Sequence, residues 1–177
     1  MMVQHSFLRT TALVTIAAFL ALALGACGLG KNPDAPRDEN GKVTEQADIG
    51  AYKVRNGDCL LNPGMSGFTT VTVTPCSAEH DLEAFAQTPV TGDTYPGDDA
   101  VQKQYTEFCS AEFKKLMNTD VKTSVYSTTG LYPNQKSWDE NEDRQILCLI
   151  GQVDVAASTG GDLTFKKTTG SLIDAKK

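Results

Sequence analysis

Residues 71–85 read VTVTPCSAEHDLEAF and predict the central feature of the fold. Valine and threonine alternate up to Thr74, which is typical of a half-buried strand, and Pro75 ends the pattern. A turn that carries Cys76 and His80 follows. Alternating apolar residues then resume and predict a second strand. The stretch therefore predicts two strands joined by a corner that presents a histidine.

Residues 1–26 predict an export signal. Arg9 precedes an uncharged apolar run that is too short for a comfortable permanent membrane span. The LGAC sequence at residues 24–27 resembles the lipobox of bacterial lipoproteins, in which the cysteine is acylated and becomes the first residue. That resemblance implies a lipid on Cys27 and a location at the outer face of the cytoplasmic membrane. An ordinary cleaved signal peptide or an uncleaved signal anchor is the alternative.

The cysteine count supports this interpretation. The chain has five cysteines, and a lipid on Cys27 leaves an even set for two disulfides. Three pairings are possible, and we expect Cys59 with Cys76 and Cys109 with Cys148. The first bridge would join the ends of a local β segment, and the second would join a helix to the strand that it covers. Metal ligation or a redox pair is the weaker alternative, because the domain has no closely spaced cysteine pair. We therefore predict no metal and no cofactor.

The composition divides the mature chain into three parts. Residues 27–50 hold the lipidated cysteine and a polar stretch that we interpret as a flexible linker. Residues 51–155 are long enough for one domain with a modest core. Residues 156–177 predict a flexible tail, from which a short piece around Phe165 could dock. Loss of Arg9 with the signal takes the net charge from −6 to −7. An acidic body argues against nucleic acid and against electrostatic binding to anionic lipid.

Periodicity predicts a small, disulfide-stapled α+β domain, with an antiparallel sheet of about four to five strands and one main helix packed on it. Strands are expected at residues 51–54, 68–74, 83–90, 123–127 and 145–155. The last of these is apolar almost throughout, which is typical of a central strand with both faces covered.

The helix is the clearest element in the pattern. We expect Asp98 and Asp99 to supply its N-cap and to favour its first turn through the helix dipole. Apolar residues at spacings of three and four then run from Val101 to Met117 and predict one buried stripe. Further along the chain, the acidic segment around Trp138 predicts a loop.

His80 is the candidate catalytic residue because Asp81 and Glu83 lie close to it in the sequence. A histidine beside a carboxylate can act as a general base or a metal ligand. Catalysis needs further groups, and the sequence offers no nucleophile motif. We therefore favour a structural role, in which the histidine and both carboxylates hold or flank a turn.

Trp138 and Arg144 form a second candidate binding pair. Tryptophan and arginine are frequent at the centres of protein interfaces. The alternative, which we favour, is that Trp138 packs over the sheet as part of the core.

These features together resemble the septum formation family of actinobacterial extracytoplasmic proteins. The matching motifs are Gly57-Asp58-Cys59-Leu60, Val73 to Asp81 with Glu83, Tyr95-Pro96-Gly97, Cys109, Trp138, and Arg144 followed by Cys148. The resemblance implies membrane attachment by a lipid or a transmembrane helix, and a link to septum formation. It supplies no catalytic residue.

The leading hypothesis is a lipid-anchored, non-enzymatic binding or accessory module of the cell envelope, with no nucleic-acid partner. Its expected partners are membrane lipid through Cys27 and envelope or division proteins or a cell-wall component. The alternative is an envelope hydrolase or metal-dependent enzyme that uses His80 with Asp81 or Glu83. A purely structural envelope protein is the third possibility.

Overall fold

The computed structural model describes residues 33–64, 69–158 and 163–174, all within one compact unit, Asn32–Lys177. The predicted signal peptide, residues 1–26, and Cys27 lie outside the described residues. Within the described ranges, no helix has both the length and the apolarity needed to cross a bilayer. The elements in chain order are β1 (Ala47–Gly50), η1 (Ala51–Lys53), β2 (Cys59–Leu60), β3 (Thr70–Thr74), β4 (Leu82–Pro89), α1 (Asp98–Met117), η2 (Val121–Thr123), β5 (Tyr126–Leu131), α2 (Gln135–Asn141) and β6 (Gln145–Gln152).

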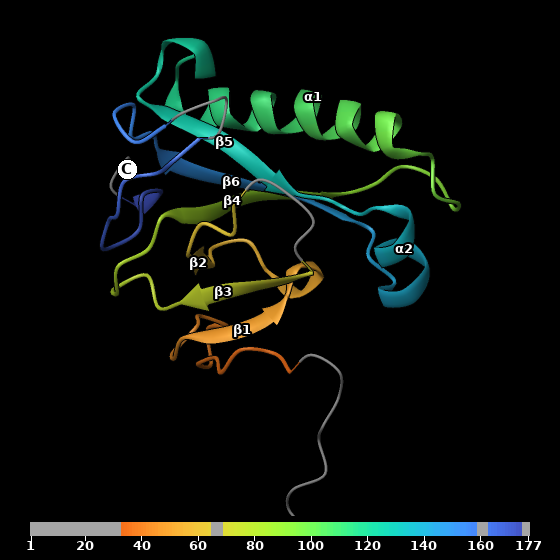
Figure 1. Ribbon diagram of the computed structural model, residues 1–177, viewed down its shortest axis with the longest axis horizontal. Coiled ribbons are helices and arrows are strands. Elements are labelled where there is room, and N and C mark those ends of the chain that lie inside the picture. Colours follow the sequence, from red (N-terminus) through yellow and green to blue (C-terminus); the bar gives the residue numbers. More distant parts are fainter. Residues whose placement is uncertain (1–32, 65–68, 159–162, 175–177) are drawn as a thin grey trace, which may run out of the picture. The chain divides into compact units, whose positions relative to one another are not determined.

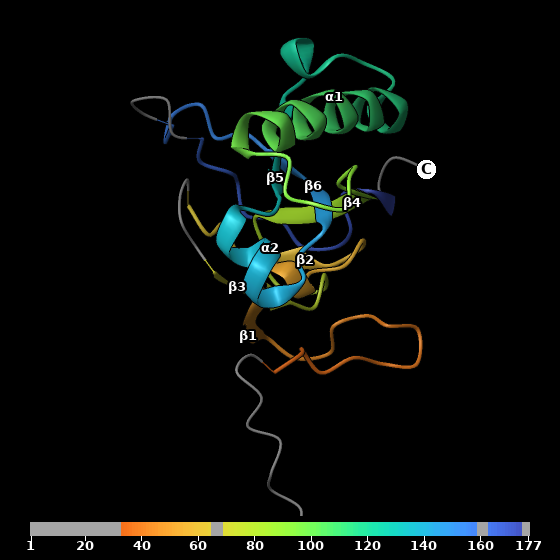
Figure 2. The same cartoon turned by 90° about the vertical axis from the view of Figure 1, so that its right-hand side faces the viewer.

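The strands form one antiparallel six-stranded sheet in the order β1-β3-β2-β4-β6-β5 (Figure 1). The stretch at residues 71–85 supplies most of β3 and the start of β4, and the short strand β2 lies between them. Helix α1 packs against β4, β6 and β5 (Figures 1 and 2). The predicted α+β class is confirmed, and the sheet has six strands where four or five were expected.

Strand β6 is covered on both faces, as its apolar sequence predicts. Alternate residues of a strand point to opposite faces of the sheet. Ile146 and Cys148 accordingly pack in a cluster with Val101 and Cys109 of α1. Leu147 and Leu149 belong to the other cluster, which includes residues of β1, β2, β3 and β4. The two clusters therefore lie on opposite faces of β6.

The helix α1 contains the predicted stripe from Val101 to Met117 and ends at Met117, and its fully buried positions are Val101, Cys109 and Phe113. Its N-cap differs from the expectation. Gly97 occupies that position with φ 93° and makes no side-chain cap, while Asp98 and Asp99 lie in the first turn. The two carboxylates therefore act through the dipole at the positive end of the helix.

Both predicted disulfides are confirmed. Cys59 bonds to Cys76 with Cα atoms 5.2 Å apart, and Cys109 bonds to Cys148 with Cα atoms 5.5 Å apart. The first bridge joins β2 to the turn after β3. The second joins α1 to β6, so it fixes the helix on the sheet.

The prediction of a flexible linker is wrong for residues 33–50, which we call the N-terminal segment. Ala35, Val43 and Ile49 are buried in the main core cluster. Residues 47–50 form β1, which pairs with β3 along its whole length. The strand expected at residues 51–54 is not found there. The 3₁₀ turn η1 occupies residues 51–53, and β1 ends just before it. A few well-placed apolar residues therefore anchor a segment whose average composition is polar.

The prediction of a flexible tail is wrong for residues 163–174, which we call the C-terminal segment. Phe165 is buried and forms an isolated β-bridge with Val153, and Thr168 forms another with His80. Gly151 leaves room for this contact, because a Cβ there would lie 2.6 Å from the Phe165 ring. The expected docking of a short piece around Phe165 is therefore found, but it extends over the whole described segment.

Two further elements differ from the sequence prediction. The strand expected at residues 123–127 lies at residues 126–131 as β5, preceded by η2. The acidic loop around Trp138 is the short helix α2. Its N-terminus carries a capping box, in which the Asn134 side chain accepts from the Ser137 N–H and the Ser137 hydroxyl oxygen accepts from the Asn134 N–H. These two bonds satisfy N-terminal donors and allow a seven-residue helix to form.

Candidate functional site

His80 lies at the corner between β3 and β4 and is fully buried. Its Nδ1–H donates to the Ala78 carbonyl oxygen at 2.9 Å, which fixes the ring within its own turn. Its backbone N–H and C=O both pair with Thr168, at 2.9 Å each. Within the described residues, the Nε2 atom is buried with no hydrogen-bond partner. The histidine is therefore mainly a structural residue that joins the corner to the C-terminal segment.

The two carboxylates beside His80 also bind the chain itself, and both are buried rather than solvated. Asp81 accepts from the backbone N–H of Asn62 at 2.8 Å and from the ammonium group of Lys167 at 3.0 Å. Glu83 makes three contacts with the C-terminal segment. It accepts from the Ser171 hydroxyl at 2.7 Å and from the backbone N–H groups of the next two residues at 2.5 Å and 3.2 Å.

A metal site at this corner can be tested from the geometry. Potential ligand atoms of Cys59, His80 and Glu83 lie within 4.8 Å of one another, and all three residues are buried. The Cys59 sulfur, however, is bonded to Cys76 and is not a thiolate. Both Glu83 oxygens already accept hydrogen bonds. A metal would have to displace the C-terminal segment and break the disulfide, so the oxidised protein does not present these groups as a ligand set.

We expect Glu83→Ala to release the C-terminal segment. The substitution removes one charge-assisted bond to a hydroxyl and two to backbone N–H groups, and such bonds contribute about 1.5–3 kcal/mol each where they are buried. Amide hydrogen exchange should therefore speed up by about tenfold or more at Leu172 and Ile173. Glu79→Ala is the matched control, because Glu79 is an exposed carboxylate of the same corner. Equal protection of these amides in both variants would contradict the assignment.

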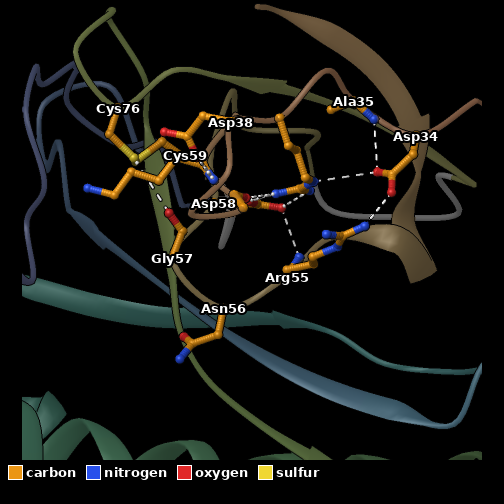
Figure 3. Close-up of polar contacts among 12 residues, drawn as sticks. Asp34, Ala35, Asp38, Arg55, Asn56, Gly57, Asp58, Cys59 and Cys76 are labelled. Carbon is orange, nitrogen blue, oxygen red and sulfur yellow. Dashed lines mark hydrogen bonds and ion pairs between the residues drawn. A yellow bond between two sulfur atoms is a disulfide. The ribbon is translucent and has the colours of Figure 1, made fainter. Parts of the chain in front are cut away.

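A second buried carboxylate, Asp58, binds the N-terminal segment (Figure 3). Its two oxygens accept from the two terminal nitrogens of Arg37 at 2.6 Å and 2.7 Å, in a bidentate pair. The side chains of this pair are only 8% and 3% exposed. The hydrogen bonds that the Arg37 guanidinium donates to Asp58 raise its pKa. Gly57 positions Asp58, because φ of 88° at Gly57 allows the tight turn in which the Asp58 N–H donates to Arg55.

Asp34 extends this contact into a small ionic network. It lies 3.6 Å from the Arg37 Nε and also pairs with Arg55 (Figure 3). The outer pair is half exposed, whereas the Arg37–Asp58 pair is not. Sequence reasoning missed this cluster. Arg37 and Asp58 are 21 positions apart, and a lone arginine in a polar stretch gives no local sign of burial.

Trp138 and Arg144 lie together on the α1 side of the sheet. Trp138 is buried, and the Arg144 guanidinium lies 3.7 Å from the centre of its ring. Arg144 also donates to the Trp138 carbonyl oxygen at 2.7 Å. Tyr95 packs at 5.6 Å from the Trp138 ring and donates to Asp98, and burial raises the pKa of this tyrosine. The packing role predicted for Trp138 is therefore found, and Arg144 covers its ring.

The candidate residues thus form two separate groups. His80, Asp81 and Glu83 lie at the start of β4, and Arg144 lies beside its end, where the Val90 N–H donates to the Arg144 carbonyl oxygen. An eight-residue strand extends about 26 Å, so the two groups do not form one site. Three buried carboxylates, Asp58, Asp81 and Glu83, share one task, which is to hold the two ends of the domain.

Comparison with known proteins gives one family assignment. The family model described as septum formation matches residues 56–177, which is more than half of the chain. The matched range includes the C-terminal segment and Asp58 but begins after Arg37. No curated protein matches the chain, and no solved structure does.

Proposed function

The chain belongs to the septum formation family, and from this premise we propose that it is a non-enzymatic binding module of the cell envelope that supports septum formation. In this proposal a lipid on Cys27 holds the domain at the outer face of the cytoplasmic membrane. Its partners are envelope or division proteins, or a cell-wall component, that meet the surface of the domain.

One observation carries the non-enzymatic part of this proposal. The buried carboxylates at the corner, Asp81 and Glu83, bind groups of the chain itself, and His80 is fully buried. General acid or base catalysis needs a group within hydrogen-bond reach of a substrate. A substrate could approach His80 only after the C-terminal segment had moved. The residues that look catalytic in the sequence therefore serve the fold, which leaves the surface for function.

The sequence supports the location. The LGAC motif at residues 24–27 supplies the acylation site, and more than one acyl chain on Cys27 would hold the protein stably, because each buried methylene contributes about 0.8 kcal/mol. The acidic net charge gives no electrostatic attraction to anionic lipid, so the anchor carries the attachment.

The second candidate function is a metal-dependent enzyme or hydrolase built on His80 with Asp81 or Glu83. The buried Nε2 of His80, which lacks a hydrogen-bond partner within the described residues, is the observation that favours it. Metal analysis of the purified protein separates the two functions. A stoichiometric metal in the wild type that is lost in a folded His80→Gln variant would favour the enzyme. A wild type without metal, together with a His80→Gln variant that is only less stable, would favour the binding module.

Deletion of the gene and complementation test the envelope role. We expect the deletion strain to place septa irregularly, a fluorescent fusion to gather at septa, and the wild-type chain to restore their placement. The Cys27→Ser variant should leave the membrane fraction and restore septation less well, because it has lost its anchor. Normal septation in the deletion strain together with an even distribution of the fusion would reject the septal role. A Cys27→Ser variant that stays with the membrane would reject lipidation at that position.

A further inference from the structure

Among the strands that the structure describes, β5 lies at one end of the sheet and pairs only with β6. Natural proteins protect such edge strands with charges, prolines or bulges, because an open edge can pair with another strand. Strand β5 has none of these. The sequence is uncharged from Thr123 to Gln135, and the pairing of β5 with β6 has no register shift.

The direction of the backbone groups along β5 follows from one hydrogen bond. The Val153 N–H donates to the Val125 carbonyl oxygen at 3.0 Å, in register with β5 and β6. The carbonyl of Val125 therefore points toward β6, and those of Tyr126 and Thr128 point away from it, because the direction alternates along a strand. The Tyr126 N–H accordingly donates to the Ser124 hydroxyl and not to β6. The outer N–H and C=O of Thr128 are thus directed away from β6, to the side on which no described strand pairs with β5.

An apolar depression adjoins this open end of β5. Its volume is about 580 Å³, and it is lined by residues of η2, the start of β5 and the chain after β6. Val125 and Val155 both line it and are 65% and 81% exposed. They are two of only three large apolar residues that are exposed in the described part of the chain. The third, Tyr132, follows the other end of β5, where Tyr105 packs against it and against Gly130.

The depression is lined by one charged group of each sign, Lys166 and Asp154. Lys166 lines it and makes no ion pair within the described residues. The Asp154 carboxylate also lines it, but accepts from the backbone N–H groups of the two alanines at residues 156 and 157. Asp154 is thus held in its own turn, whereas Lys166 has no ion-pair partner among the described residues, so a ligand that carries a carboxylate close to an apolar side chain can pair with Lys166.

We propose that the first half of β5 and this depression bind an extended peptide segment of a partner protein. The segment would add a strand beside residues 126–128, place an apolar side chain against Val125 and Val155, and direct an acidic residue to Lys166. Strand addition of this kind uses backbone bonds for affinity and side-chain pockets for specificity. This inference rests on the proposed binding function and names its surface and the class of its partner.

A second copy of the chain fits this surface less well. Antiparallel pairing of two β5 strands uses the outward groups of residues 126, 128 and 130 together when it is centred on Thr128, and this register places Val125 opposite Leu131. Leu131 is buried in its own core and cannot fill the depression of the other copy. A segment that runs past the end of β5 fills it, which favours a heterologous peptide.

The test is a fluorescence anisotropy titration of the purified, oxidised protein with two synthetic peptides. Both contain alternating threonine and valine, and one ends in two aspartates while the other ends in two lysines. We expect the acidic peptide to bind about tenfold more tightly, and Lys166→Glu to remove or reverse that preference. Thr128→Pro should weaken both peptides about tenfold or more, because it removes an outward N–H without breaking a bond to β6.

Two further variants keep the result interpretable if Thr128→Pro does not fold. Val155→Glu changes a highly exposed side chain and should weaken the acidic peptide by about tenfold. Lys42→Glu makes the same charge change on the N-terminal segment and should have no effect. Absence of binding, or equal binding by wild type, Val155→Glu and Lys166→Glu, would overturn the proposal. A dimer in sedimentation experiments that Thr128→Pro dissociates would assign the edge to a second copy instead. If the peptides fail but the deletion strain still places septa irregularly, only this surface is rejected and the proposed function stands.

Discussion

Arg37→Ala should lower the free energy of unfolding by about 3–5 kcal/mol, because it leaves the Asp58 carboxylate buried without a cation, with only the Arg55 backbone N–H still donating to it. Arg37 and Asp58 form a bidentate pair with side chains that are 8% and 3% exposed, so water cannot readily replace the lost bonds. The N-terminal segment should also detach. Urea denaturation followed by circular dichroism measures the stability, and hydrogen exchange at residues 35–50 measures the detachment.

Arg55→Ala is the matched control, since Arg55 pairs with Asp34 in the same network but is 53% exposed. Exposed ion pairs contribute about 0–1 kcal/mol, so this variant should remain close to the wild type. Equal losses in the two variants would mean that burial of the inner pair does not determine its importance. A small loss for Arg37→Ala alone would mean that the N-terminal segment is held by its apolar residues.

Removal of the bridge between Cys109 and Cys148 should lower the free energy of unfolding by about 4 kcal/mol, since this bridge closes a loop of 39 residues in the unfolded chain. The double substitution Cys109→Ala with Cys148→Ala avoids free thiols and leaves α1 held only by packing. Both positions are almost completely buried, so a small additional loss from the missing sulfur atoms is expected. Thermal and urea denaturation under non-oxidising conditions measure the change.

The bridge between Cys59 and Cys76 provides the comparison. It closes a loop of 17 residues, for which the same model gives about 3 kcal/mol. Its removal should also loosen the corner, and therefore the C-terminal segment, whereas removal of the Cys109–Cys148 bridge should loosen α1. Identical patterns of hydrogen exchange in the two double variants would contradict this division.

The elements that sequence predicted well are those whose pattern is complete within a few residues. The alternation up to Thr74, the apolar stripe of α1 and the apolar run of β6 each depend on neighbours in the chain. The disulfide pairing followed from these elements, because the favoured pairs join segments that the predicted fold brings together.

The remaining features depend on contacts between residues far apart in the sequence. Residues 33–50 look like a linker because their burial rests on one ion pair to Asp58 and on scattered apolar side chains. The C-terminal segment is held by Glu83, which lies 88 positions before Ser171. A local composition average contains neither contact. The helix α2 is different, since the Asn134 and Ser137 spacing was visible and was a usable capping signal.

The candidate site was located correctly in the chain but not in its role. The sequence placed His80, Asp81 and Glu83 at a corner between two strands, and the structure has them there. It could not identify what the carboxylates bind, because most of their partners belong to the C-terminal segment, more than 80 positions away. Residues that resemble catalytic groups in the sequence can therefore serve to hold the segments of a small domain together.

In the proposed anchoring through Cys27, the folded N-terminal segment limits the distance between this domain and the membrane. A linker of residues 28–50 could extend to about 80 Å, but only the five residues 28–32 separate Cys27 from the described chain at Pro33, which allows about 20 Å. With a lipid on Cys27, a short connecting segment would keep the domain close to the bilayer surface. Breaking the Arg37–Asp58 ion pair would lengthen that connection. One buried ion pair would therefore set the distance from the membrane at which the domain can meet other envelope components.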